Sequence, residues 1–257
     1  MVRLVSGTET NKWLPPIYRK CTFPILRQPA KTHNDIVGSA FLLHYRKIPY
    51  VVTAKHVIDV VNPAIAFSKK DRQVLSVCTS ALEQAGLKWI EHPADCDIAA
   101  IPFHLPLRIV NVLNIKLITE EKWIIQRKFK EGSWIAHLGF PDGGTSNFSD
   151  GSSSVFPQAM PGKIMKIMIG TRARFVMETA GTFGASGGPV FLREENNTFS
   201  LIGITIKETM LGKHTRPSEA EPLNKTTALP ISLVKDIFES EEMVKQYENR
   251  VINEEWF

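Results

Sequence analysis

The sequence predicts an all-β protein with two β-barrels, joined by a crossover segment and followed by a C-terminal helix. Short apolar runs rich in Val, Ile and Phe alternate with Gly, Pro and Asn, a texture typical of strands and turns. The runs form two groups on either side of residues 104–131, where apolar and charged residues are mixed. From residue 230 onward, apolar residues recur at threes and fours, which indicates a helix.

The expected strands divide between the two barrels. Those of the first barrel cover 36–44, 48–53, 64–68, 73–79 and 97–103, and those of the second cover 133–139, 162–169, 174–179, 188–193, 199–207 and 226–229. Polar stretches at 141–154 and 208–224 are expected to be surface loops. The domain division is an N-terminal extension at 1–34, a first barrel at 35–103, a crossover at 104–131, a second barrel at 132–229 and a C-terminal helix at 230–257.

The C-terminal helix has both a start signal and an apolar face. Ser232 is the expected N-cap, because its hydroxyl can accept a hydrogen bond from the first helical turn. Apolar residues recur there at helical spacing, at Leu233, Ile237, Val244 and Tyr247. We expect the helix to pack on the second barrel through Leu233 and Ile237.

Composition excludes several classes of protein. The chain has 257 residues, 43% hydrophobic and 22% charged, which is typical of a globular protein and not of a disordered or fibrous one. No apolar run approaches the roughly 20 residues of a membrane span, and the start lacks the pattern of a secretion signal. Three scattered cysteines, Cys21, Cys78 and Cys96, lack the spacing of a metal knuckle or redox pair. We therefore expect a soluble, cytoplasmic protein with free, buried thiols.

A net charge of +5 raises the question of acidic partners. Residues 1–60 carry a basic excess and residues 239–257 an acidic one. The sequence shows no RNA-binding aromatic signature, zinc finger or helix-turn-helix pattern, so nucleic-acid binding is disfavoured and two solvated faces are expected.

The most informative segment is Gly184-Ala185-Ser186-Gly187-Gly188-Pro189. Glycines on both sides of a serine allow a sharp turn that aims amide groups inward, so the N–H groups of Gly184 and Ser186 could form an oxyanion hole beside a nucleophile. A tight turn with a solvent-facing serine is the alternative. The nucleophile elbow of α/β-hydrolases is disfavoured, because that fold needs an acid and then a histidine downstream and only His214 follows, in a polar stretch.

Two upstream residues complete a possible catalytic set. His56 directly follows a strongly apolar run at 50–54, where an imidazole can be fixed and still be reachable as a general base. Asp97 begins the apolar run 98–101, where a buried carboxylate would need a partner such as an imidazole. Asp95 is the alternative acid, although an aspartate at the start of a strand is often a turn residue.

Together these segments resemble the chymotrypsin-like (trypsin-like) serine protease family, whose catalytic order is His, Asp, Ser. The motifs are Thr53-Ala54-Lys55-His56, Asp97-Ile98-Ala99 and Gly184-Ala185-Ser186-Gly187-Gly188-Pro189. Within the family the chain is most similar to the bacterial high-temperature-requirement type, on the basis of Gly38-Ser39-Ala40-Phe41 and Leu138-Gly139-Phe140-Pro141. The likeness covers residues 36–238 and leaves no length for the peptide-binding C-terminal domain usual in that type.

The resemblance implies two six-stranded antiparallel barrels with an active site in the cleft between them. It implies a serine endopeptidase acting on a protein or peptide: Ser186 attacks the carbonyl, His56 moves the proton, Asp97 orients His56, and the amides of Gly184 and Ser186 stabilise the oxyanion. No metal or cofactor is required. The alternative is a catalytically silent fold that binds protein or nucleic acid.

The sequence departs from the family at Ala185, where relatives carry Asp or Asn. This removes a polar anchor of the oxyanion loop, so we expect a loop that is partly disordered until substrate or an activating protein binds. By the same likeness, the specificity pocket has its floor at Ala180, with Thr182 and Phe183 nearby, and a wall at Thr205, Ile206 and Lys207. The floor carries no acid, which predicts cleavage after a small or medium apolar residue.

Overall fold

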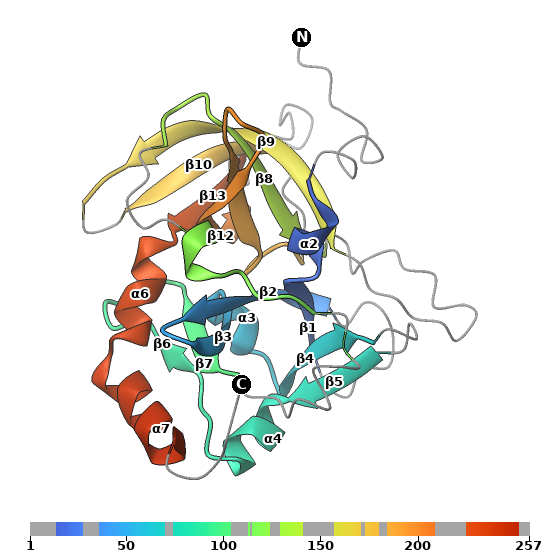
Figure 1. The fold of residues 1–257 in the computed structure, drawn as a ribbon, viewed down its shortest axis with the longest axis vertical. Helices are drawn as coiled ribbons and strands as arrows, with labels where there is room; N and C mark the ends of the chain where they lie inside the picture. The colour runs from blue at the N-terminus through green and yellow to red at the C-terminus, as the bar shows by residue number, and fades with distance from the viewer. Residues whose placement is uncertain are drawn as a thin grey trace, which may run out of the picture.

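A computed structural model describes residues 14–27, 36–69, 74–103, 113, 115–123, 129–140, 157–170, 173–179, 184–208 and 225–251. A β-sheet formed by the first half of the chain lies below a β-barrel formed by the second half in the view of Figure 1. Two helices, α6 (Ser232–Phe238) and α7 (Glu241–Val251), follow the barrel and run down one side of the molecule toward the sheet.

The first half is an antiparallel sheet of seven strands in the order β5-β4-β1-β2-β3-β7-β6. The strands are β1 (Thr22–Arg27), β2 (Ile36–Tyr45), β3 (Ile48–Thr53), β4 (Pro63–Ser68), β5 (Val74–Cys78), β6 (Ile90–Glu91) and β7 (Ala99–Pro102). The expectation of a six-stranded closed barrel is wrong here, because the described sheet is open. After β5 the chain forms the helix α4 (Thr79–Gln84), and β6 has only two residues; within the described residues the edge strands β5 and β6 do not pair.

Strand β1 lies within residues 1–34, which the sequence analysis expected to be an extension. It pairs with both β2 and β4, so it is an interior strand of the sheet. Its sequence, TFPILR, is short and contains Pro24, and a proline argues against an interior strand because it cannot donate to the ladder. A short helix, α2 (Pro16–Arg19), precedes it.

The second half is a closed antiparallel barrel of six strands in the order β10-β13-β12-β11-β8-β9, which confirms this part of the expected fold. Its strands are β8 (Trp134–Gly139), β9 (Gln158–Met168), β10 (Arg174–Thr179), β11 (Pro189–Arg193), β12 (Phe199–Glu208) and β13 (Lys225–Pro230). Strand β9 begins four residues before the expected residue 162. Pro161 and Gly162 lie inside the strand, although both residue types usually weaken strands, and this is why its start was predicted too late.

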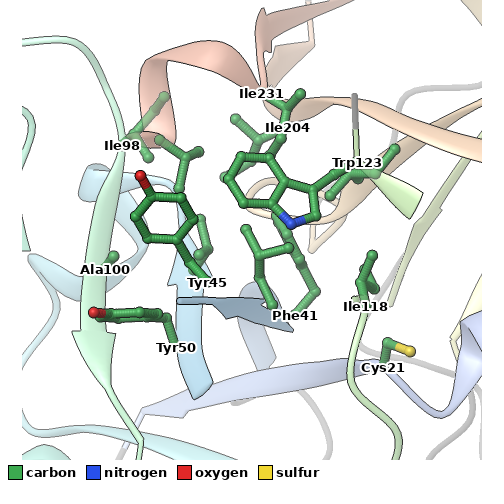
Figure 2. Packing of buried hydrophobic residues seen from close by; sticks show 14 of the residues in the cluster. Cys21, Phe41, Tyr45, Tyr50, Ile98, Ala100, Ile118, Trp123, Ile204 and Ile231 are labelled. Carbon is green, nitrogen blue, oxygen red and sulfur yellow. The ribbon is translucent and has the colours of Figure 1, made fainter. Parts of the chain in front are cut away.

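A hydrophobic cluster joins the two halves. In β2, Phe41 and Leu43 face this shared cluster, whereas Ala40 and Leu42 face a second cluster on the other side of the sheet. Figure 2 shows Trp123 of the crossover and Ile204 of β12 close to Phe41. The described crossover touches both halves: Ile118 bridges to Leu43, and Trp123, after the 3-10 helix η2 (Glu120–Lys122), bridges to Leu201. The interior of the barrel holds a third cluster around Phe175.

The C-terminal segment is helical as expected, but it forms two helices. The break follows Phe238, where Ser240 Oγ accepts a hydrogen bond from the N–H of Met243 at 3.3 Å and so caps α7. Ser232 is the first residue of α6 and not its N-cap, which is Ile231. In α7, Met243 is buried whereas Val244 is 40% exposed, so Val244 does not belong to the buried face.

The cysteines only partly match expectation. All three are free thiols, but only Cys21 is buried, and burial raises the pKa of Cys21 to about 12. Cys78 and Cys96 are half-buried. In the described ranges, no helix is both long and apolar enough to cross a membrane. The loops expected at 141–154 and 209–224 lie outside the described residues, and Glu208 ends β12.

Candidate active site

The histidine singled out in the sequence lies in α3 (Lys55–Ile58), a short helix directly after β3. His56 Nδ1 is 2.7 Å from Asp97 Oδ2, and the backbone N–H of His56 donates to Asp97 Oδ1 at 3.0 Å. One carboxylate therefore accepts from the ring and from the main chain of the same residue. An ionised Asp97 fixes the tautomer with hydrogen on Nδ1, which leaves Nε2 as a proton acceptor.

Asp97, not Asp95, contacts the imidazole. Asp95 Oδ1 instead lies 3.1 Å from Lys55 Nζ, and the Asp95 side chain is 88% exposed. The expectation that Asp97 is a buried residue at the start of a strand is wrong, however. It lies in the loop between β6 and β7, two residues before β7 begins, and its side chain is 34% exposed, so it is neither in the strand nor buried.

Ser186 lies in a turn that requires glycine at positions 184 and 187. Gly184 and Gly187 have φ angles of +90° and +84°. A Cβ atom on Gly184 would overlap the carbonyl of Phe140, and one on Gly187 would overlap the carbonyl of Ser39. Both glycines are needed for conformation and for close packing against the neighbouring chain.

Ser39 ties this turn to the strands that lead to His56. Its N–H donates to Ser186 O at 2.7 Å, and its hydroxyl donates to Gly184 O at 2.7 Å while accepting from the N–H of Phe140 at 3.2 Å. The carbonyl of Ser39 accepts from Thr53 Oγ1 at 2.7 Å. Ser39 is fully buried, so it holds the serine turn of the second half against β2 and β3 of the first half.

The role of Ser39 was not predicted from the sequence, although the motif at 38–41 was singled out. The available signal was a small polar residue inside an otherwise apolar strand. Phe140, from the motif at 138–141, meets the same serine, because its N–H donates to Ser39 Oγ. The two motifs that carried the finer resemblance therefore pack around the serine turn.

The amides of the turn divide into two groups. Gly187 N–H donates to Thr205 O at 2.6 Å, and Gly188 N–H donates to Ala185 O at 3.1 Å. Within the described residues, no hydrogen bond uses the amides of residues 184–186. This group contains the two amides expected to bind an oxyanion, those of Gly184 and Ser186. Ala185 is buried and has no polar side chain to hold the turn. The Ser39 hydroxyl instead donates a hydrogen bond to the turn, at Gly184 O.

The Ser186 hydroxyl donates to the carbonyl of Ile206 at 3.4 Å. Among the described residues it makes no hydrogen bond to His56. Catalytic hydrogen bonds are often long or misaligned in the free protein and tighten when substrate binds. A rotation about the Cα–Cβ bond of Ser186 is the change required to turn the hydroxyl away from Ile206.

The expected pocket is described only in part, because Ala180, Thr182 and Phe183 lie outside the described residues. Thr205 is buried, and its hydroxyl lies 3.5 Å from Nδ1 of the buried His137, a residue to which the sequence analysis gave no role. Ile206 is half-buried and meets Ser186 through its carbonyl. Lys207 belongs to β12. In the part of the chain that the structure covers, no three His, Cys, Asp or Glu side chains are grouped to hold a metal.

Solved structures share this fold at low sequence identity. A serine endoprotease from Yersinia pestis aligns with a TM-score of 0.56 and 15% identity, over 94% of this chain and 67% of that one. The Rv3671c protein of Mycobacterium tuberculosis, crystallised in an inactive form as a serine-to-alanine mutant, aligns with a TM-score of 0.53 and 14% identity, over 97% of both chains. No protein-family model and no curated protein matches the sequence. The fold is therefore that of the chymotrypsin-like serine proteases.

Proposed function

We propose that this protein is a serine endopeptidase that uses His56, Asp97 and Ser186. The observation that carries the proposal is the double acceptance by Asp97, which receives hydrogen bonds from both the ring and the backbone of His56. This arrangement favours the proton-accepting tautomer of His56. The Ser39 hydrogen bonds hold Ser186 against the strands that precede that histidine.

The reaction follows from these positions. Ser186 Oγ attacks the carbonyl carbon of the scissile peptide bond as its proton moves to His56 Nε2, and the N–H groups of Gly184 and Ser186 stabilise the negative oxygen. His56 then gives the proton to the leaving amine, and an ester to Ser186 remains. Water attacks this ester with His56 again accepting the proton, and the acid product leaves with Ser186 restored.

The finer features rest on the sequence resemblance. The likeness to the bacterial high-temperature-requirement type comes from the motifs at 38–41 and 138–141. Ser39 of the first motif binds the serine turn and also accepts a hydrogen bond from Phe140 of the second. The preference for a small or medium apolar residue rests on the absence of an acid at Ala180. A library of peptides digested with the protein tests this preference, and cleavage mainly after arginine would contradict it.

The activity itself is tested with a fluorophosphonate probe, followed by peptide mass spectrometry to find the labelled residue. We expect label on Ser186 in the natural protein and none in Ser186→Ala or His56→Ala. Absence of label in a folded protein, together with peptide or nucleic-acid binding, would favour the silent binding fold. Labelling that appears only after a partner protein is added would support the expected activator.

A further inference from the structure

The 91–97 loop, which begins at the last residue of β6, carries Asp97 and a concentration of negative charge. Glu91, Asp95 and Asp97 lie within seven residues, and the loop turns tightly, with the N–H of Asp95 donating to His92 O at 2.9 Å. Asp95 itself has a φ of +51°, a conformation that costs energy for any residue with a side chain. Mutual repulsion of three carboxylates opposes this compact shape.

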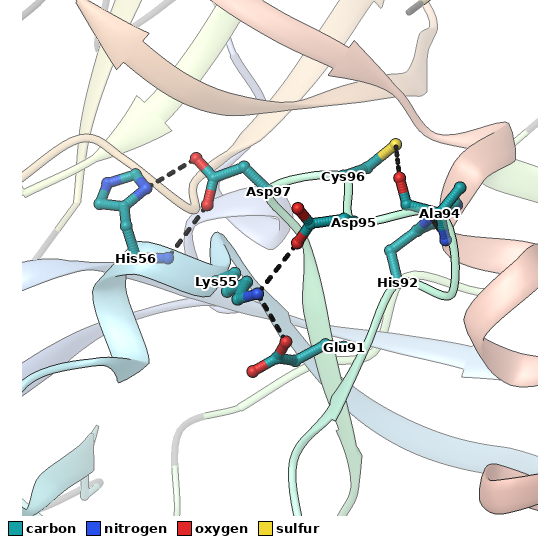
Figure 3. A network of polar contacts seen from close by, with 8 residues as sticks. All are labelled: Lys55, His56, Glu91, His92, Ala94, Asp95, Cys96 and Asp97. Carbon is teal, nitrogen blue, oxygen red and sulfur yellow. Dashed lines mark hydrogen bonds and ion pairs between the residues drawn. The ribbon is translucent and has the colours of Figure 1, made fainter. Parts of the chain in front are cut away.

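Lys55 is the cation that meets this charge. Its Nζ lies 2.7 Å from Glu91 Oε2 and 3.1 Å from Asp95 Oδ1, so one ammonium group joins both sides of the loop (Figure 3). These hydrogen bonds, to Glu91 first and then to Asp95, raise the pKa of Lys55, which stays charged at neutral pH. Lys55 directly precedes His56 in α3, so the same short helix holds the loop and presents the imidazole.

The other side of the loop is joined to its own strand end, because the N–H of His92 donates to Ile98 O at 3.1 Å. His92 Nδ1 accepts from the N–H of Ala94 at 3.1 Å, which fixes the turn locally. His92 Nε2 lies 3.4 Å from Asp236 Oδ2 of α6 but makes no directed hydrogen bond to it. The contacts of Lys55 are therefore the closest side-chain link that the described structure shows between the loop and the helix of His56, apart from Asp97 itself.

We propose that Lys55 is a positioning residue, which holds the 91–97 loop against α3 and thereby sets where Asp97 meets His56. This inference rests on the proposed function for its catalytic consequence, but its structural part does not. The neighbouring Ile98 is fully buried, but the Asp97 side chain is partly exposed, so its own burial does not fix its direction. Lys55 supplies that restraint from outside the catalytic set.

The test compares Lys55→Met with Lys55→Arg, and uses Lys245→Met as a matched control. Lys245 also forms an ion pair, at 2.6 Å from Glu241, but on α7. The first readout is the downfield NMR signal of the His56 Nδ1 proton, which reports the hydrogen bond to Asp97 in any folded protein, active or silent. The second is the second-order rate of reaction with a fluorophosphonate.

We expect Lys55→Met to broaden or remove the proton signal and to slow the fluorophosphonate reaction by about 10- to 100-fold, because a displacement of about 1 Å can cost about 100-fold. The loss should stay below the roughly 10⁴-fold drop that follows removal of the orienting acid's charge. Lys55→Arg should retain both readouts, and Lys245→Met should behave like the natural protein.

The outcomes separate this proposal from the proposed function. If the natural protein does not react with the probe, the proton signal alone decides the role of Lys55. A sharp, unshifted signal in Lys55→Met would overturn the proposal whether or not the protein is active. If Lys55→Met does not fold, the double variant Glu91→Gln and Asp95→Asn removes the same ion pairs while it lowers the local charge, and an unchanged signal there would equally overturn the proposal.

Discussion

Ser39 is a polar residue with no exposure to solvent, and its N–H, carbonyl and hydroxyl groups all form hydrogen bonds. Replacing it by alanine leaves Gly184 O and the N–H of Phe140 without their partner, at a cost of about 1–3 kcal/mol in the free energy of unfolding. It also frees the carbonyl of Gly184, the residue whose N–H is expected to bind the oxyanion. We expect Ser39→Ala to react with the fluorophosphonate about tenfold more slowly.

The matched control is Ser200→Ala. Ser200 is also buried and its hydroxyl contacts Glu194, but it lies on β12 away from the turn. We expect a comparable loss of stability by urea denaturation with an unchanged rate of labelling. If both alanine variants slow the labelling equally, Ser39 has no specific role at the serine turn.

At the scale of elements, the hairpin between β2 and β3 turns through Arg46 and Lys47, whose φ angles are +47° and +68°. A two-residue turn with positive φ at both positions favours Asn-Gly. A positive φ costs a residue with a side chain about 1–3 kcal/mol. Arg46 is held by Glu120 and Glu239, whereas Lys47 is exposed.

Lys47→Gly is therefore expected to stabilise the protein by about 1 kcal/mol, after allowance for the greater freedom of glycine in the unfolded chain. Urea denaturation measures this gain. Lys47→Ala keeps the Cβ atom and should show no gain. An equal gain from alanine would mean that relief of backbone strain is not the cause.

Glu239 joins the end of α6 to the same hairpin. Its carboxylate accepts from Tyr45 Oη at 2.6 Å and lies 3.0 Å from Arg46 Nη2. The Tyr45 hydrogen bond lowers the pKa of Glu239 in the folded protein. A lowered folded-state pKa contributes stability above the ordinary pKa of glutamate, and this contribution is lost as pH falls through the lowered value.

Glu239→Gln should therefore lower the free energy of unfolding at pH 7, and the difference from the natural protein should shrink as pH falls below about 4. Urea titrations at several pH values measure it. Glu241→Gln, which removes an exposed ion pair in α7, is the control and should have little effect at any pH. A difference for Glu239→Gln that is constant with pH would contradict the assignment.

For the whole molecule, α6 and the crossover make the sheet and the barrel one unit. Phe238 stacks on Tyr50 of β3 with ring centroids 4.1 Å apart, and it meets Trp123 of the crossover at 6.3 Å. The same cluster contains Ile204 and Leu229 of the barrel. We expect Phe238→Ala to cost about 3–5 kcal/mol and to destabilise both halves together.

Hydrogen exchange of β3 and β12 amides in the natural protein and in Phe238→Ala measures this coupling. Protection should fall by a similar amount in both strands. Loss of protection in β3 alone would show that the barrel folds independently of the sheet. Phe175→Ala is the control, because it makes a cavity in the cluster inside the barrel. It shows how protection changes when the cavity lies within one half.

The sequence determined the features that depend on local pattern and chain order. Short apolar runs predicted two barrels, of which the second is closed, and most strands to within a few residues. The helical spacing after residue 230 predicted a single C-terminal helix, and the segment forms two. The order of His56, Asp97 and Ser186, with glycines around the serine, was also readable, because a sharp turn leaves a glycine signature.

Tertiary structure alone decided what depends on contacts between distant segments. It made β1 an interior strand in spite of Pro24, since pairing with β2 and β4 outweighs a local preference. It left the first sheet open, and it gave Ser39 and Lys55 their neighbours. Hydrogen bonds and ion pairs between residues far apart in the chain leave no period in the sequence, so only the folded chain shows which side chains meet.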